Sequence, residues 1–292
     1  MKDHLINIGE IKLQVREYPS EGEAIIFLHF SGSNMLMWDD VIPFFQDKYR
    51  LILFDLKGHG RSDKPKTGYN KDELAKEVIQ ALDQLEVNSF HIIGSSMGVE
   101  VGLSVAANHP NRVLSLVCDG GMFNESGPYG LWEGTDEEFQ AHAIERVEKL
   151  RTTSPTTYPT VDDMVVANRK VFEEMGWWSN GYEAVIRYGA VQHPGGQFSS
   201  GWGHIAEDYT KHYLHNRLED YYSKLQCPVL MLPDTYPGQD DREKEIMHAM
   251  FEMVGKGKIV TVPEWVHPFG WMITPEAVSQ VILEFLSEVN SM

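Results

Sequence analysis

The feature that most constrains this chain is an apolar run, Phe90 to Ile93, which leads into the segment Gly94 to Gly98 and then into residues at helical spacing. This order predicts a strand, a sharp turn and a helix. Such a turn strains the backbone of its central residue, and a glycine two residues to either side lets strand and helix pass closely. The pattern therefore predicts a nucleophilic hydroxyl on Ser96, exposed at a strand end beside a helix N-terminus.

Apolar runs and amphipathic segments alternate along most of the chain. Residues 5–9 and 11–18 alternate apolar and polar side chains, which predicts two edge strands joined by a tight turn. Continuous apolar runs, typical of parallel strands covered on both faces, occupy residues 24–29, 50–55, 90–94, 113–118, 227–232 and 258–262. Helical spacing is found at residues 38–45, 70–85, 97–108, 242–253 and 275–289. The sequence therefore predicts an α/β fold with a mostly parallel, doubly wound sheet of about eight strands.

The alternation stops in the segment 122–223, where helical spacing continues without a strong buried strand. The clearest helices are predicted at residues 137–150 and 161–175. Because ligands bind at the carboxyl edge of parallel sheets, we expect this insertion to form a helical lid on a core of residues 1–121 and 224–292. At least half of its tryptophans should pack the lid onto the sheet, and others should line a pocket. The four are Trp132, Trp177, Trp178 and Trp202.

Charge and cysteine content exclude several classes of partner. The formal net charge is −18, which makes nucleic acid and anionic membranes poor partners and leaves a small molecule as the expected one. Cys118 and Cys227 lie in apolar runs and are expected to be buried thiols in a reducing compartment. The first residues lack an apolar signal core, and no run is long enough to cross a bilayer, so a cytoplasmic location is expected. The sequence carries no signal for an oligomeric state.

Four stretches, taken in order, carry a resemblance to a known family. They are residues 28–33, 55–62 and 94–98 and the late His267. On these residues the chain resembles the α/β-hydrolase superfamily, over residues 1–121 and 224–290. The resemblance implies that Ser96 sits in a nucleophile elbow and belongs to a catalytic triad that needs no cofactor.

The base that activates the serine is assigned to a late histidine. A serine hydroxyl is a weak nucleophile near neutral pH and needs a base within hydrogen-bond reach. The resemblance places this base at His267, after the last predicted strand, with Val266 where the family commonly has glycine. His204, His212 and His215 lie in one segment of the insertion, but no nearby cysteine or carboxylate completes a usual metal site, so no metal is expected.

The acid that orients the base has several candidates. The family usually carries it after the strand at residues 228–232, but the familiar Gly-x-x-Asp pattern is absent there. Asp240 has a family-like separation of 27 residues from the histidine and is our first choice, with helix capping as its structural alternative. Asp119 is the rival, because some relatives, such as certain haloalkane dehalogenases, carry the acid after that strand. Asp234 and Asp241 are the remaining candidates.

Acyl transfer also needs hydrogen-bond donors for the developing oxyanion. The resemblance implies the amide of Met97 as one donor and the amide of Phe30 or Ser31, in the loop after His29, as the other. Relatives usually have glycine at position 30. If that position required positive φ, phenylalanine would cost about 1–3 kcal/mol, so we expect this loop to have a different shape.

These predictions favour a serine hydrolase that cleaves an ester-like bond, such as a carboxylic ester, lactone or thioester, through an acyl-enzyme. The substrate is expected to be small and largely apolar. Serine at the nucleophile position argues against haloalkane dehalogenase and epoxide hydrolase chemistry. The alternative from another class is a small-molecule receptor with little or no catalysis on the same fold. The missing Gly-x-x-Asp pattern and Phe30 favour this alternative, whereas Ser96 and His267 oppose it.

Overall fold

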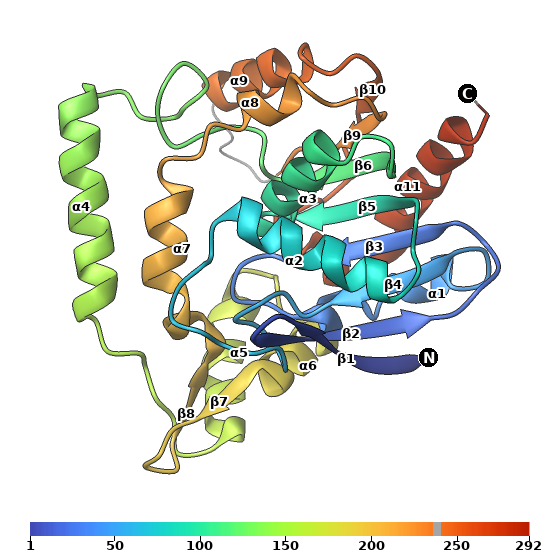
Figure 1. Cartoon of the computed structure of the whole chain (residues 1–292). Coiled ribbons are helices and arrows are strands. Elements are labelled where there is room, and N and C mark those ends of the chain that lie inside the picture. Colours follow the sequence, from blue (N-terminus) through green and yellow to red (C-terminus); the bar gives the residue numbers. More distant parts are fainter. Residues whose placement is uncertain (236–240, 292) are drawn as a thin grey trace.

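The computed structural model of this chain describes residues 1–235 and 241–291. Its main sheet is built from β1 (Lys2–Ile8), β2 (Ile11–Tyr18), β3 (Ala24–Leu28), β4 (Arg50–Phe54), β5 (Phe90–Ser95), β6 (Val113–Asp119), β9 (Val229–Met231) and β10 (Gly257–Ile259). The order across the sheet is β1-β2-β4-β3-β5-β6-β9-β10 (Figure 1). The β1–β2 and β2–β4 pairs are antiparallel, and the other pairs are parallel. The predicted α/β fold with a mostly parallel sheet is confirmed.

Helices cover both faces of the sheet because its central strands are apolar on both sides. Along β3, Ile26 and Leu28 pack into one hydrophobic cluster, and Ile25 and Phe27 pack into another on the opposite face. The first cluster includes residues of α2 and α3, and the second includes residues of α1 and α11 (Figure 1). The helices of this part of the chain are η1 (Met35–Trp38), α1 (Ile42–Phe45), α2 (Lys71–Gln84), α3 (Met97–Asn108), α9 (Asp241–Phe251), α10 (Gly270–Ile273) and α11 (Pro275–Val289).

The segment between β6 and β9 leaves the sheet and forms a separate layer beside it (Figure 1). Its elements are α4 (Asp136–Thr152), α5 (Val161–Glu174), α6 (Asn180–Gly189), β7 (Ala190–Gln192), β8 (Phe198–Ser200), η2 (Gly201–His204), α7 (Ala206–Tyr213) and α8 (Glu219–Tyr222). Both helices predicted here are present as α4 and α5, and each begins with a capping box, at Thr135 and Thr160.

The insertion was expected to lack a strong buried strand, and its two strands are short and mostly half-buried or exposed. β7 and β8 pair in an antiparallel hairpin, with Val191 opposite Ser199. Each strand has three residues, which is too short for an alternating pattern to stand out in the sequence. Two other features of the described chain agree with the sequence. Cys118 and Cys227 are buried free thiols, and none of the described helices has the length and apolar character needed to span a bilayer.

Candidate active site

The turn between β5 and α3 holds Ser96 in an uncommon backbone conformation. Its φ is 49° and its ψ is −117°, a positive φ that side chains rarely adopt. A Cβ atom on Gly94 would lie 2.8 Å from the carbonyl carbon of Gly98, so a glycine is required where strand and helix cross. The Ser96 amide donates a hydrogen bond to the Asp119 carbonyl oxygen at 2.7 Å, which ties the turn to β6. The predicted strand, turn and helix are therefore present.

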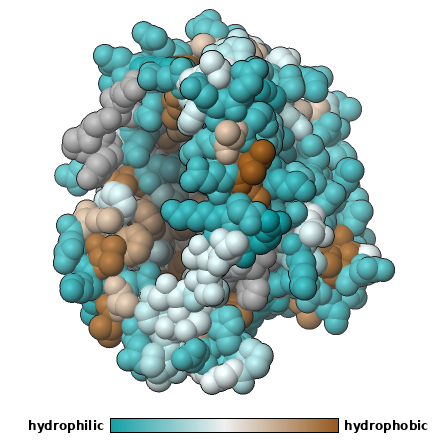
Figure 2. Space-filling view, turned by 90° about the vertical axis from the view of Figure 1, so that its left-hand side faces the viewer, coloured by the Kyte–Doolittle hydropathy of each residue, from teal (hydrophilic) through white to brown (hydrophobic). Residues whose placement is uncertain are grey.

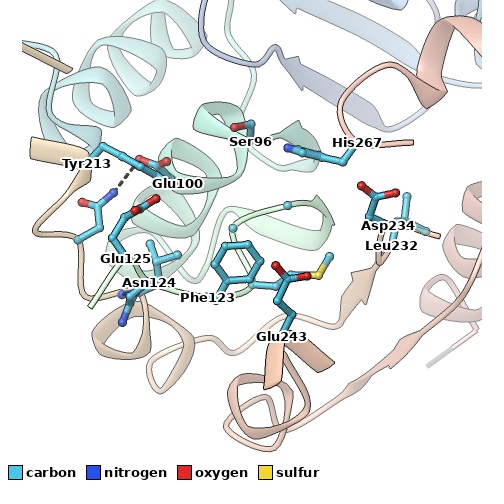
Figure 3. Close-up of a pocket in the computed structure, with 15 residues that line it drawn as sticks. Ser96, Glu100, Phe123, Asn124, Glu125, Tyr213, Leu232, Asp234, Glu243 and His267 are labelled. Carbon is cyan, nitrogen blue, oxygen red and sulfur yellow. Dashed lines mark hydrogen bonds between the residues drawn. The ribbon is translucent and has the colours of Figure 1, made fainter. Parts of the chain in front are cut away.

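Ser96 opens into a cavity of about 430 Å³ between the sheet edge and the insertion (Figure 3). The parts of the chain outside segment 122–223 contribute Ser96, Glu100, Gly120, Gly121, Leu232, Asp234, Glu243 and His267 to its lining. The insertion contributes Met122, Phe123, Asn124, Glu125, Tyr213, Asn216 and Leu218. Viewed from the side that α4 and α7 form, the molecular surface is hollowed, with hydrophobic residues in the hollow and mostly hydrophilic ones around it (Figure 2).

His267 lies in the segment between β10 and α10, and its imidazole points toward Ser96 (Figure 3). Its Nδ1 atom is 2.8 Å from Oδ1 of Asp119, at the end of β6. The carboxylate can only accept, so Nδ1 carries the proton and Nε2 is left to act as a base. Gly120, with a φ of 86°, makes this approach possible, because a Cβ atom there would lie 2.6 Å from Cε1 of His267.

The charge of Asp119 controls the basicity of His267. Burial on its own would lower the pKa of His267, but the charge and hydrogen bond of Asp119, with the charge of Asp234, raise it above the ordinary value of 6.5. The imidazole is thus a stronger base than a free histidine. The side chain of His267 is 27% exposed, whereas that of Asp119 is fully buried.

Asp119 accepts three further hydrogen bonds, from side chains to which the sequence pattern assigns no role. Nε1 of Trp265 donates to Oδ1 at 3.2 Å, and Nε1 of Trp271 donates to Oδ2 at 2.7 Å. The Ser95 hydroxyl donates to Oδ2 at 2.6 Å. Of these three donors, only Ser95 has a sequence position that points to the site, because it precedes the nucleophile on a strand that pairs with β6.

The remaining aspartates have different surroundings. Asp240, our first choice for the acid, lies outside the described residues. Asp234 lines the cavity near His267 (Figure 3). Asp241 begins α9, its side chain is 97% exposed, and its carboxylate lies 3.6 Å from Nζ of Lys244. Among the described aspartates, Asp119 is the one hydrogen-bonded to the base.

The loop after β3 does not place Phe30 at positive φ, so the strain considered for that residue does not arise. The turn is made instead by Gly32, with a φ of 84°. The Gly32 amide donates to Nε2 of His59 at 2.9 Å, and the Ser33 amide donates to the Phe30 carbonyl oxygen at 3.1 Å. These two amides are occupied, so the Phe30 and Ser31 amides remain the candidates for the second oxyanion donor. The first candidate, Met97, is the first residue of α3, where an amide has no acceptor within its helix.

The cavity is more acidic than the sequence predicted. Apolar side chains such as Phe123 and Leu232 share its lining with Glu100, Glu125, Asp234 and Glu243, and the described lining includes no lysine or arginine. Glu100 is buried and accepts hydrogen bonds from the Tyr209 hydroxyl and from Nδ2 of Asn216, both at 2.8 Å. Burial raises the pKa of Glu100, and these two hydrogen bonds offset part of that effect.

The tryptophans of the insertion pack against other side chains. Trp132 stacks on His142 with ring centroids 5.0 Å apart, and Trp177 stacks on Phe269 at 5.3 Å. Trp178 meets Tyr182 edge-on at 6.0 Å. None of these three lines the cavity at Ser96, and the side chain of Trp202 lies outside the described part of the structure. The aromatic residues of the insertion in the cavity wall are Phe123 and Tyr213.

Comparison with known proteins decides the family. A family model described as the alpha/beta hydrolase fold matches residues 23–232. The chain belongs to this family. A 3-oxoadipate enol-lactonase from Acinetobacter baylyi is 40% identical over 94 residues, which is 32% of this chain and 35% of that protein. A fluoroacetate dehalogenase from a Burkholderia species is 24% identical across 98% of this chain and 94% of its own length.

Solved structures agree on the fold. A crystal structure of E-2-(acetamidomethylene)succinate hydrolase matches with a TM-score of 0.76 and 20% identity, covering 98% of this chain and 99% of the other. The chain aligns with only 35% of the enol-lactonase and with 43% of a 2-(acetamidomethylene)succinate hydrolase from Mesorhizobium japonicum. Family membership and these enzyme relatives support hydrolase activity in general, and the similarity leaves the substrate open.

Proposed function

We propose that this protein is a serine hydrolase that cleaves an ester-like bond in a small molecule. Ser96 attacks the carbonyl carbon, and His267 takes the hydroxyl proton and passes it to the leaving group. Asp119, rather than Asp240, orients the histidine. The amide of Met97 and an amide of the loop after β3 stabilise the oxyanion, and water then releases the acyl group from Ser96.

One observation carries this proposal. A serine held at positive φ shares a cavity with a histidine whose Nδ1 atom is 2.8 Å from a buried aspartate. The strained turn exposes the hydroxyl, and the aspartate leaves Nε2 of His267 free to accept a proton, which are the two requirements of an activated serine. Serine at position 96 also argues against dehalogenase chemistry, although one relative is a dehalogenase.

The insertion fits the role of a lid over a core of residues 1–121 and 224–292. Segment 122–223 supplies seven of the residues that line the cavity, and the rest of the chain supplies the catalytic groups. Substrate must therefore lie between these two parts, which is the usual arrangement at the carboxyl edge of a parallel sheet.

The charge of the cavity points to substrates without a negative charge. The described lining carries the acidic side chains of Asp234, Glu243 and Glu125, the last paired with Arg146 at 3.4 Å, and no lysine or arginine, which disfavours an anion in a confined site. The name of one relative contains succinate, a dicarboxylate, and such a substrate suits this cavity poorly. We therefore propose an ester, lactone or thioester whose acyl and leaving groups are neutral or cationic.

A fluorophosphonate probe tests the proposal directly, because it labels only an activated serine. The Ser96 oxygen should bond to the phosphorus of the probe as fluoride leaves, so the protein gains the mass of one phosphonyl group, and it should hydrolyse a simple aryl acetate. Ser96→Ala should abolish labelling and lower kcat by about 10⁶. The matched control is Ser104→Ala, further along the same helix, where the hydroxyl donates to Asp72 at 2.6 Å and lies outside the cavity lining.

The outcomes separate hydrolase from receptor. Labelling of Ser96 in the wild type and in Ser104→Ala, with none in Ser96→Ala, supports the hydrolase. If Ser96→Ala keeps more than about a hundredth of the activity, the serine mechanism is wrong. A folded wild type that is neither labelled nor active on esters, lactones and thioesters, yet binds small molecules in the cavity, would favour the receptor.

A further inference from the structure

The buried carboxylate of Asp119 has an unusually complete set of hydrogen-bond donors. Oδ1 receives His267 Nδ1 and Trp265 Nε1, and Oδ2 receives Trp271 Nε1 at 2.7 Å and Ser95 Oγ at 2.6 Å. The four donors come from β5, from the segment after β10 and from α10. Only the donor on Oδ1 from His267 belongs to the proposed catalytic machinery.

Such donors are needed because an isolated buried carboxylate is strongly disfavoured. Asp119 is fully buried, and within the described residues its one ion pair is with His267. Fixed N–H and O–H dipoles can replace water around a negative charge without neutralising it. They also fix the plane of the carboxylate, since donors on both oxygens oppose rotation about the Cβ–Cγ bond.

The two indoles are themselves held rigidly. Trp271 packs edge-on against Trp38 at 4.7 Å and against Trp265 at 5.0 Å, and all three rings are fully buried. The indole N–H of Trp38, by contrast, has no hydrogen-bond partner in the described structure. Packing alone therefore explains Trp38, but it does not explain why both neighbouring indoles direct an N–H at the same carboxylate.

We propose that Ser95, Trp265 and Trp271 are positioning residues that hold the carboxylate of Asp119 correctly oriented toward His267. This inference rests on the proposed function, in which Asp119 orients the catalytic base. The residue before the nucleophile and the two tryptophans near the base thus share one role, which is to fix the orientation of the acid. None of the three touches the substrate in this role, because they act through the carboxylate.

The variants Trp271→Phe and Ser95→Ala test this role, because each removes one donor from Oδ2 and leaves the contact of Oδ1 with His267. Each donor stabilises the negative charge of Asp119, so its loss strengthens the attraction between that charge and the imidazolium. The acidic limb of the kcat/KM profile should move to higher pH by about 0.5 to 1 unit. At pH 8, kcat/KM should fall about tenfold.

Trp38→Phe is the matched control. It removes an indole N–H from the same cluster at the same depth, and Asp119 does not accept a hydrogen bond from it. Its acidic limb should coincide with that of the wild type, even if its melting temperature falls. Asp234, the other carboxylate whose charge acts on His267, is unchanged in all these variants.

Direct titration of His267 by NMR gives the same comparison without an activity assay, and His267→Gln assigns the resonance. A midpoint displaced to higher pH in Trp271→Phe and Ser95→Ala, with the wild-type value in Trp38→Phe, supports the inference. A downward displacement would contradict the expected direction and overturn it. Unchanged midpoints in folded variants, or an equal shift in Trp38→Phe, would overturn it. A wild type without hydrolase activity would refute the proposed function, while this titration would still decide the role of the donors.

Discussion

At the scale of the single residue, Asp119 is the side chain whose substitution should lower the rate most, after Ser96 and His267. Asp119→Asn replaces the carboxylate that fixes the tautomer of His267, and kcat/KM should fall by about 10⁴. The pKa of His267 should fall as well, because burial lowers it once the opposing charge is gone. Ester hydrolysis and NMR titration of His267 measure the two effects.

Asp240→Asn is the comparison that separates the two candidate acids. An aspartate that only caps a helix contributes about 1 kcal/mol of stability and little to the rate, so this variant should melt earlier and turn over normally. If Asp240→Asn loses activity and Asp119→Asn keeps it, Asp119 has only a structural role and our assignment of the acid is wrong.

Gly120 allows a second prediction at this scale. Gly120→Ala should lower kcat/KM at least tenfold, because its Cβ atom would meet the His267 ring at 2.6 Å and displace the base. Gly196→Ala is the matched control: its φ is 82°, close to the 86° of Gly120, but its Cβ atom meets no other atom within 4 Å. Both variants carry similar backbone strain of about 1–2 kcal/mol, and only Gly120→Ala should change the rate. Equal rate losses in the two variants would mean that contact with the ring is unimportant.

The sequence could predict the serine and the histidine as candidates but not the contact between His267 and Asp119. A strained turn between strand and helix has a local signature, whereas this contact joins residues 148 positions apart. Spacing along the chain favoured Asp240, which lies 27 residues before the histidine, but spacing carries no information on which carboxylate contacts the imidazole in space. The sequence could not predict that the indoles of Trp265 and Trp271 donate hydrogen bonds to Asp119, because a buried tryptophan normally indicates packing.

At the scale of elements, Glu100 links the helix that follows the nucleophile to the insertion. Its carboxylate, on α3, accepts hydrogen bonds from Tyr209 of α7 and from Asn216, beyond the end of α7. Because burial raises the pKa of Glu100 above its ordinary value of 4.5, the folded state holds this proton more tightly than the unfolded state. The free energy of unfolding should therefore decrease as pH rises from 4.5 through the raised pKa.

Glu100→Gln should remove this pH-dependent decrease in the free energy of unfolding, because glutamine does not titrate. The melting temperature of the variant minus that of the wild type should increase steadily as pH rises above 4.5. Glu145→Gln, at an exposed position of α4, controls for the loss of one negative charge. Melting curves between pH 4 and pH 8 give the comparison. A difference that stays constant or shrinks with pH would show that Glu100 is ionised at no cost to stability.

Elements differ in how well the sequence predicts them. Helices α4 and α5 agree with the predicted ranges to within two residues, because capping residues and long apolar stripes mark them. β10 was expected at residues 258–262 and spans only Gly257–Ile259, since pairing with the short β9 limits its length. The β7–β8 hairpin was missed because strands of three residues depend on tertiary contacts more than on local pattern.

At the scale of the whole molecule, a net charge of −18 and the acidic side chains of Glu125, Asp234 and Glu243 in the cavity act in the same direction on an approaching substrate. Long-range charge governs the rate of encounter, and carboxylates in the cavity govern binding. Aryl esters that differ only in the end of the acyl chain separate these effects. kcat/KM should be lowest for an anionic end and higher, by about tenfold to a hundredfold, for neutral or cationic ends.

Two double variants with equal net charge locate the source of this preference. Glu125→Gln with Glu243→Gln removes charge from the cavity, and Glu10→Gln with Glu21→Gln removes it from exposed positions near the N-terminus. If the cavity discriminates, the first pair should raise kcat/KM for the anionic ester, and the second should leave the preference nearly intact. Added salt should weaken only the contribution of the exposed charges, since the Debye length falls to about 3 Å at 1 M. Faster hydrolysis of the anionic ester by the wild type would contradict the proposed substrate class, because it would require a cationic group in a cavity whose described lining is acidic.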